Sequence, residues 1–204
     1  RNLRVFMKSW ITPFPVALPA QQDHLQLFDT TTQQKRRVTV TDNHATMYVC
    51  GITPYDATHL GHANPYVTFD LLYRYWLAAG YRVTYTQNVT DVDDPLFERA
   101  NEMGIDYQEL SEDQTNLFRS DMQHLNVLAP SHYLLVSETA DWVRTMVREM
   151  LDAGVAYTVP GDARNPDGDI YFSIEAAEQH TDWRLGSVGA HSQQEMTEFF
   201  PERG

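Results

Sequence analysis

The feature that most constrains the fold is an apolar run that leads directly into a glycine-containing polar segment, between positions 45 and 62. Ala45–Gly51 mixes β-branched, aromatic and small apolar side chains, which is typical of a buried strand in a parallel sheet. An amphipathic segment follows from about Leu60. A strand that feeds a helix binds ligands beyond its carboxyl end, where the free N–H groups of the helix attract an anion. The run therefore predicts an α/β fold with a nucleotide site at this point.

Two histidines and the only cysteine of the chain lie at this predicted site. His59 and His62 are three residues apart, which puts both imidazoles on one side of a first helical turn. Gly61 between them lets a nucleotide approach the backbone closely. A lone histidine usually caps or packs, and a lone thiol such as Cys50 is usually a small buried hydrophobic group. Their combination indicates a nucleotide-activating site instead.

The segment His59–His62 resembles the HIGH signature of class I aminoacyl-tRNA synthetases. Met47–Thr53 and Gln87–Asp94 occur in the order and spacing of the cysteinyl branch, which contains the cysteinyl-tRNA synthetases and the mycothiol cysteine ligases. Pro54 and the segment Asp94–Ala100 resemble the ligases more than the tRNA enzymes. The resemblance implies a Rossmann-like parallel sheet of the class I synthetase type, of which this chain holds the first half, with a small α+β insertion.

The same resemblance implies an activity and a set of site residues. The ligases join L-cysteine to the amino group of glucosaminyl-inositol through a cysteinyl-adenylate in mycothiol biosynthesis, converting ATP to AMP and pyrophosphate. By residue-to-residue correspondence, His59 and His62 are the predicted catalytic residues. The predicted adenylate-binding residues are Cys50, Gly51, Ile52, Thr53, Asn88, Val89 and Thr90.

Cys50 also corresponds to a zinc ligand of the cysteinyl branch, where the metal binds the substrate thiol. Zinc prefers a soft thiolate to a hydroxyl, so it can select cysteine over serine. Structural zinc takes four ligands. The segments that carry the other family ligands do not occur in these 204 residues. A tight zinc site is therefore not expected here, and the chain alone is expected to be inactive.

Two alternatives stay open. The chain could be the N-terminal part of a cysteinyl-tRNA synthetase, or a non-catalytic nucleotide-binding module. A formal net charge of −13 argues against a nucleic acid partner, because such binding depends largely on neutralising phosphates. Asp91, Asp93 and Asp94 could suggest a divalent metal, but acids before a helix with Pro95 near its start favour helix capping. A single cysteine and no transmembrane span predict a cytoplasmic enzyme that does not contact a membrane. A monomer is expected.

One position departs from the ligase pattern. Pro65 stands where many ligases carry a threonine that helps to hold the adenylate, so that contact cannot be transferred to this chain. Because proline is tolerated in the first helical turn, Pro65 predicts a helix start at about Asn64. The helix is predicted to end at Gly80.

The chain is predicted to have three parts. Residues 1–24 form an N-terminal extension that is partly disordered, residues 25–154 the first half of the catalytic domain, and residues 155–204 the truncated start of the inserted subdomain. Pro201–Gly204 resembles the opening of a ligase segment, so a longer enzyme is expected. Periodicity and turn residues predict strands at Gln26–Asp29, Arg37–Val40 and Tyr81–Thr86, helices at Leu96–Met103, Tyr107–Leu125 and Glu138–Ala153, and a hairpin of Val155–Val159 with Asp169–Ile174. In the last helix, Val143, Met146, Val147, Met150 and Leu151 are predicted to face inward.

Overall fold

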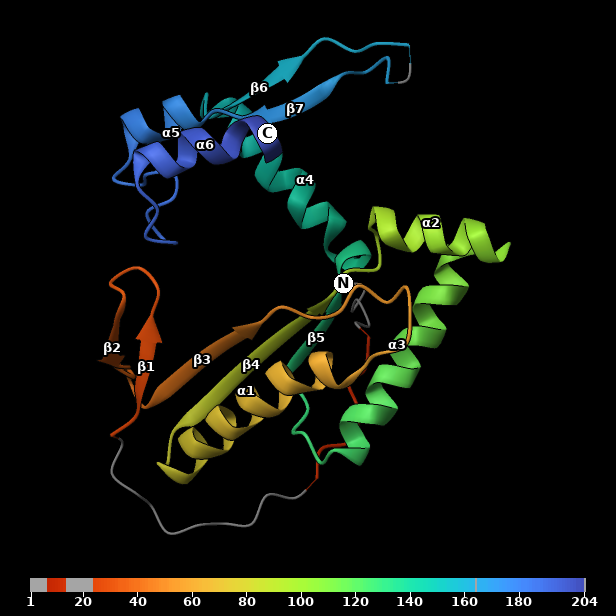
Figure 1. The fold of residues 1–204 in the computed structure, drawn as a ribbon, viewed down its shortest axis with the longest axis vertical. Coiled ribbons are helices and arrows are strands. Elements are labelled where there is room, and N and C mark those ends of the chain that lie inside the picture. Colours follow the sequence, from red (N-terminus) through yellow and green to blue (C-terminus); the bar gives the residue numbers. More distant parts are fainter. Residues whose placement is uncertain (1–6, 14–23, 164, 204) are drawn as a thin grey trace, which may run out of the picture. The chain divides into compact units, whose positions relative to one another are not determined.

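The computed structural model describes residues 7–13, 24–163 and 165–203 (Figure 1). The chain divides into two compact units. The first unit contains residues 1–23 and 39–140, and the second contains residues 24–38 and 141–204. The domain boundaries expected from the sequence remain a prediction.

A parallel three-stranded sheet forms the centre of the first unit, in the order β3-β4-β5. Its strands are β3 (His44–Val49), β4 (Arg82–Val89) and β5 (His132–Leu135). Helix α1 (Leu60–Ala78) connects β3 to β4, and helices α2 (Asp94–Met103) and α3 (Tyr107–His124) connect β4 to β5. Parallel neighbours need such helical crossovers, which is the arrangement of a Rossmann-like fold. The predicted α/β class is therefore confirmed. Helix α1 runs along the sheet and contacts β4 (Figure 1).

Side chains alternate between the core and the outer face along β3. Ala45, Met47 and Val49 are buried, whereas Thr46 and Tyr48 are exposed. This alternation follows from the two-residue period of a strand. The sequence analysis expected β3 and β4 but not β5, which is only four residues long and follows Pro130 without a periodic pattern.

An N-terminal segment, Met7–Pro13, packs into the core of the first unit. The indole of Trp10 is 6% exposed and donates through Nε1 to the carbonyl oxygen of Val127 at 2.8 Å. Its ring meets Phe118 and Tyr133 edge-to-face, with centroids 5.9 and 5.6 Å away. Aromatic pairs of this geometry add to the stability gained from burial. Trp10 therefore joins α3 to β5.

Helix α1 begins at Leu60, so the predicted start at Asn64 is wrong. His59 is the N-cap, and the side chains of His59 and His62 bond to backbone N–H groups of the first turn. Pro65 lies inside the helix, where the missing donor leaves the Gly61 carbonyl without its usual i+4 partner. The histidine caps fix the start one turn earlier than the proline suggested. Gly80 follows the helix end with φ of +84°, the left-handed conformation that is common for a glycine just after a helix. The predicted helix end at Gly80 is therefore confirmed.

Helices α2 and α3 begin with aspartate caps. The carboxylate of Asp93 accepts a bond from the Asp94 N–H, and Pro95 lies in the first turn of α2. Asp106 accepts from the N–H groups of Gln108 and Glu109 at the start of α3. The capping interpretation of Asp93 is therefore confirmed.

The second unit consists of two antiparallel hairpins and short helices. Strand β1 (Gln26–Asp29) pairs with β2 (Gln34–Arg37), and β6 (Ala156–Val159) pairs with β7 (Asp169–Phe172). Both hairpins were predicted, although β2 begins three residues earlier than expected because the turn is tighter. Helices α5 (Ile174–His180) and α6 (Gln193–Arg203) were not predicted, since both are short and polar.

Helix α4 (Val136–Asp152) begins in the first unit and continues into the second. It has no buried residue, and Val143 and Met146 are 51% and 55% exposed. The inward orientation predicted for these two residues is therefore wrong. The apolar stripe was read correctly, but a stripe is buried only where another element packs on it. Within the described residues, no helix is both long and apolar enough to cross a membrane.

Candidate active site

The carboxyl ends of β3 and β4 lie side by side because the two strands are parallel, with Tyr48 opposite Thr86 and Val49 opposite Gln87. The residues that follow β3 remain hydrogen-bonded to residues at the end of β4 and just beyond it. The Gly51 N–H donates to Oδ1 of Asn88 at 2.9 Å, and the Thr90 N–H donates to the Ile52 carbonyl at 2.9 Å. Two predicted groups of site residues, at positions 50–53 and 88–90, therefore meet at one sheet edge.

The side-chain amide of Asn88 is held in one orientation. Its Oδ1 accepts from the Gly51 N–H and from the Tyr48 hydroxyl, both at 2.9 Å. A backbone N–H can only donate, so the amide oxygen must face it, and Nδ2 is left to donate to Thr90 Oγ1 at 3.3 Å. Tyr48 was missed by the sequence analysis. The register of β3 against β4 is the signal that could have found it.

Gly51 is required at its position by close packing. A Cβ atom there would lie 1.5 Å from the carbonyl oxygen of Asn88, which no side chain can tolerate. Ile52 and Val89 are 6% and 0% exposed, so their side chains belong to the core. These two predicted ligand contacts can therefore offer only backbone groups.

The loop that connects β3 to α1 is tied down at two points. The hydroxyl of Thr53 donates to Asp93 Oδ2 at 3.1 Å, and the hydroxyl of Thr58 donates to Asp121 Oδ2 at 2.8 Å. These bonds attach the loop to the start of α2 and to α3. Because the Thr53 hydroxyl donates its hydrogen atom to Asp93, its oxygen can still accept a hydrogen bond from a ligand.

The two histidines form a reciprocal cap at the start of α1. Nδ1 of His59 accepts from the Gly61 N–H at 3.0 Å, and Nδ1 of His62 accepts from the His59 N–H at 3.3 Å. The rings lie 4.1 Å apart and are exposed. Because each Nδ1 accepts a bond, a neutral ring must carry its proton on Nε2. The site therefore presents two Nε2–H donors beside a helix N-terminus, which suits an oxyanion.

Cys50 follows β3 directly, and its thiol is exposed. Its carbonyl oxygen accepts from the Tyr66 hydroxyl at 3.4 Å. Burial raises the pKa of Tyr66, so this phenol stays protonated and remains a donor. Among the residues that the structure describes, no three His, Cys, Asp or Glu side chains are grouped to hold a metal ion. Cys50 thus fits zinc as one soft ligand, but the described residues do not complete a site.

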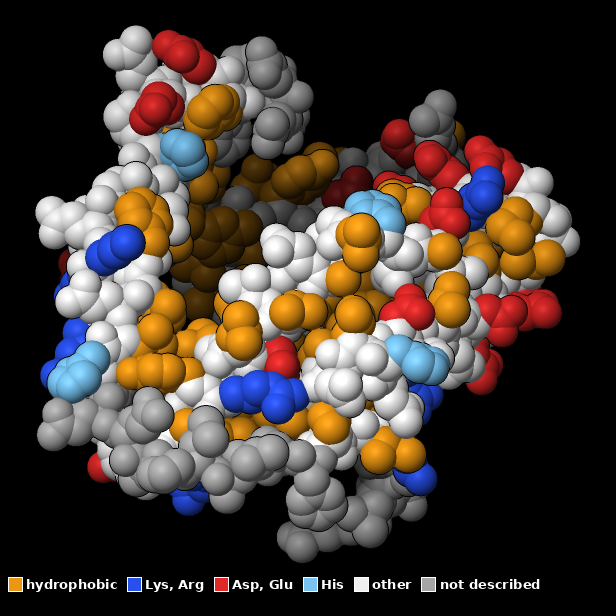
Figure 2. Space-filling model, turned by 60° about the horizontal axis from the view of Figure 1, so that its bottom comes forward, with side chains coloured by type: hydrophobic (Ala, Val, Ile, Leu, Met, Phe, Trp, Pro, Cys, Tyr) orange, Lys and Arg blue, Asp and Glu red, His pale blue; other side chains and the backbone are white. Residues whose placement is uncertain are grey.

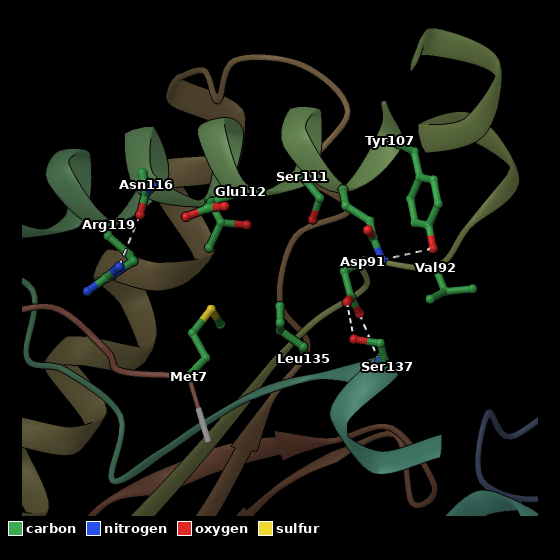
Figure 3. Close-up of a pocket in the computed structure, with 12 residues that line it drawn as sticks. Met7, Asp91, Val92, Tyr107, Ser111, Glu112, Asn116, Arg119, Leu135 and Ser137 are labelled. Atoms are coloured by element: carbon green, nitrogen blue, oxygen red, sulfur yellow. Dashed lines mark hydrogen bonds between the residues drawn. The ribbon is translucent and has the colours of Figure 1, made fainter. Parts of the chain in front are cut away.

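A cavity of about 340 Å³ lies in the first unit beside this sheet edge (Figure 3). Its walls come from α3, from Asp91 and Val92 after β4, from Leu135 and Ser137 around the start of α4, and from Met7. Each carboxylate oxygen of Asp91 accepts one hydrogen bond from Ser137, from its N–H and from its hydroxyl. The sequence analysis did not anticipate this cavity, since its lining combines four separate segments.

A family model described as tRNA synthetases class I (C) catalytic domain matches residues 36–199. The chain belongs to this family. Solved structures of the same class share the fold: a Mycobacterium tuberculosis methionyl-tRNA synthetase in complex with methionyl-adenylate has a TM-score of 0.52 at 20% identity, covering 56% of this chain and 23% of that one. An Agrobacterium radiobacter leucyl-tRNA synthetase complex gives 0.50 at 18% identity, covering 57% and 15%.

The resemblance to the mycothiol cysteine ligases is confirmed by curated relatives. A protein of Micrococcus luteus named L-cysteine:1D-myo-inositol 2-amino-2-deoxy-alpha-D-glucopyranoside ligase is 56% identical over 97% of this chain and 47% of its own length. A protein of the same name from Kineococcus radiotolerans is 50% identical over 97% and 46%. The chain therefore spans about half the length of the curated relatives it matches.

Proposed function

We propose that this chain is the ATP- and cysteine-binding part of a ligase that joins L-cysteine to the amino group of glucosaminyl-inositol. The observation that carries the proposal is the pair of Nε2–H donors on His59 and His62, beside the Asn88 amide at the same sheet edge. The names of the relatives supply the substrates. The reaction proceeds through a cysteinyl-adenylate and releases AMP and pyrophosphate.

In the first step, a carboxylate oxygen of cysteine attacks the α-phosphorus of ATP, and the bond from that phosphorus to pyrophosphate breaks. Negative charge moves onto the phosphate oxygens as the leaving group departs. In this proposal the Nε2–H groups of His59 and His62 and the N-terminus of α1 stabilise this charge. One preorganised donor of this kind contributes about 3 to 4 kcal/mol to a transition state.

The remaining predicted residues hold the aminoacyl part. Asn88 and Thr53 offer short polar groups whose orientation is fixed by Gly51 and Asp93. Such fixed groups lose little freedom when a ligand binds. Cys50 would supply one ligand to a zinc ion that, when bound, holds the substrate thiol, but the other ligands must come from outside the described residues.

A cysteinyl-tRNA synthetase is the second candidate, and the description of the matching family model favours it. Both enzymes would form the adenylate, so the acceptor decides between them. Consumption of glucosaminyl-inositol without tRNA would identify the ligase, and cysteinylation of tRNA would identify the synthetase. The net charge of −13 supports the ligase.

Replacement of His59 tests the proposal. Asparagine is a good N-cap but lacks the Nε2–H donor. His59→Asn should therefore keep the start of helix α1 and lose the activation of cysteine by ATP. We expect cysteine-dependent ATP–pyrophosphate exchange by the complete gene product to fall about a hundredfold in both His59→Asn and His59→Ala. Only the alanine variant should also lose about 1 kcal/mol of stability.

His124→Asn provides the control, because His124 is an exposed histidine on α3 away from the sheet edge. It should exchange at the rate of the wild type. Unchanged exchange in His59→Asn would refute the role of this histidine. The 204-residue chain on its own is expected to show no exchange, and measurable turnover would contradict the view that further residues are needed.

A further inference from the structure

Helix α3 carries an unusual polar stripe beside its apolar one. Leu110, Phe118 and Met122 face the core, but the neighbouring Ser111 and Thr115 are also buried, at 6% and 3% exposure. Both line the cavity. Thr115 Oγ1 has no hydrogen-bond partner among the described residues. A buried polar atom without a partner costs about 1 to 3 kcal/mol, so this stripe is poorly explained by packing alone.

The cavity lining also contains the charged side chains of Glu112 and Arg119. Glu112 forms no ion pair with any described residue. The guanidinium of Arg119 donates to Asn116 Oδ1 and to the Ser9 carbonyl, both at 3.1 Å, and its buried Nε has no partner within the described residues. Figure 3 shows Ser111 and Glu112 on α3 facing Met7 and Leu135 across the cavity. The lining thus combines one available carboxylate and one guanidinium with hydroxyl, amide and apolar groups.

One wall of the cavity comes from a part of the chain that the general family model does not reach. That model begins at residue 36, whereas Met7 lies in the segment that packs Trp10 into the core. The relatives named as ligases align over 97% of the chain, a share that includes Trp10. The cavity is therefore completed by a segment shared with the ligases.

The cavity adjoins the predicted adenylate residues. The turn that carries Asp91 and Val92 into the lining also carries Thr90, which bonds to Asn88, and Asp93, which bonds to Thr53. A ligand in the cavity and an adenylate at the sheet edge would thus both lie against the turn at residues 90–93.

We propose that this cavity binds a polyhydroxylated primary amine, with its ammonium group on Glu112 and its hydroxyl groups on the polar stripe of α3. This inference rests on the proposed function, in which such an amine is the acceptor. In that reaction the amine loses a proton, and its nitrogen lone pair attacks the carbonyl carbon of the adenylate. The C–N bond forms, the bond to AMP breaks, and a second proton leaves as the amide is made.

Calorimetric titration tests the binding site directly. Methyl α-D-glucosaminide and its N-acetyl derivative are titrated into the 204-residue chain and into the complete gene product. We expect the amine to bind about tenfold more tightly than the acetamide, because only the amine is charged. Glu112→Gln should remove this difference by weakening amine binding alone. Asp113→Asn, on the same helix but outside the lining, should preserve it.

Equal binding of the amine and the acetamide, or a Glu112→Gln variant that binds like the wild type, would overturn the inference. Thr115→Val gives a second check, because it removes the unpartnered hydroxyl at nearly constant volume. It should weaken the binding of both sugars severalfold without lowering the melting temperature. Glu112 is exposed, so its replacement leaves the fold intact.

Kinetics of the complete gene product separate this inference from the proposed function. Cysteine-dependent ATP–pyrophosphate exchange needs no acceptor. If the wild type exchanges, Glu112→Gln should leave exchange unchanged and raise the KM for glucosaminyl-inositol about tenfold. Exchange with an unchanged acceptor KM would overturn the cavity assignment alone. Absence of exchange in the wild type would overturn the proposed function, and the titration would still decide the cavity.

Discussion

The two units of the chain differ sharply in how much apolar surface they bury. Of the buried hydrophobic residues in the described ranges, all but Ala177 belong to the first unit. In the second unit Phe28, Trp142 and Tyr171 are 58%, 49% and 50% exposed. Exposed hydrophobic side chains are visible on the drawn face of the molecule (Figure 2). The difference teaches that strands joined by helical crossovers make their own core, whereas hairpins and short helices need another surface to do so.

The predicted catalytic chemistry lies entirely in the first unit. His59, Asn88 and Thr90 are held by elements with a continuous core, which keeps donors and acceptors at fixed positions. Preorganised groups of this kind are most effective when their support is rigid. The first unit therefore has the core needed to hold catalytic groups in place, whereas the second unit buries few hydrophobic side chains of its own.

Truncation of a core aromatic residue should give the largest contrast. Phe118 is fully buried against Trp10 and Tyr66, so Phe118→Ala should lower the free energy of unfolding by about 3 to 5 kcal/mol. Tyr171→Ala on β7 removes a half-exposed ring and should cost less than about 1 kcal/mol. Urea titration of both variants measures this. Similar losses in the two would break the comparison.

Two buried tyrosines within the first unit give a finer comparison, because only one of their hydroxyl groups has a hydrogen-bond partner among the described residues. The Tyr85 hydroxyl donates to the buried Gln87 Oε1 at 2.6 Å, so Tyr85→Phe should cost about 1 to 3 kcal/mol by leaving that oxygen unpaired. The Tyr133 hydroxyl has no partner among the described residues. Tyr133→Phe should therefore change stability by less than about 1 kcal/mol. Thermal unfolding of both variants decides, and a larger loss for Tyr133→Phe would contradict this account.

Alkaline pH should weaken the first unit. Burial raises the pKa of Tyr66, Tyr85 and Tyr133 above the ordinary value of 10.0. Because the folded-state pKa is the higher one, the neutral phenols stabilise the fold below about pH 10, and this stability is lost as the pH rises further. The melting temperature should therefore begin to fall at about pH 10 and continue to fall as the pH rises further. Tyr133→Phe should reduce this fall, and an identical slope in the variant would argue against a contribution from Tyr133.

The smallest effect is expected in the β1–β2 hairpin of the second unit. Hydrogen bonds from Thr32, Arg36 and Thr31 lower the pKa of the partly exposed Asp29 below its ordinary value of 3.8. Its stabilising effect is therefore present above that value and lost as the pH falls. Amide resonances of the hairpin should shift as the pH falls below 3.8, while those of β3 to β5 stay in place. Simultaneous loss of all signals would show that the two units are not independent.

Much of the fold followed from local patterns, and the errors came from tertiary context. The β3–α1 unit, helices α2 and α3 and both hairpins were predicted because periodicity, caps and turn residues mark them. Pro65 gave a wrong start for α1, because the histidine caps that override it depend on side-chain geometry. Strand β5 was missed because its four residues show no regular alternation of polar and apolar side chains.

The candidate site divides in the same way. A motif at one helix start could identify His59 and His62 in advance, and the structure adds that both rings are caps. Tyr48, and the contact of Asp93 with Thr53, became apparent only in the structure, because each hydrogen bond joins residues 40 positions apart in the chain. The cavity needed four segments to be brought together. Roles for all these residues remain predictions until the variants are measured.

The position of Trp10 has a consequence for how the protein is made. Trp10 is synthesised before its partner, because the carbonyl to which its indole donates lies 117 residues later in the chain. At about 5 to 20 residues per second, this aromatic side chain waits about 6 to 23 s for its partner. During that interval the nascent chain exposes a tryptophan that the finished protein hides. The segment Met7–Pro13 therefore closes the core only after β5 has been synthesised.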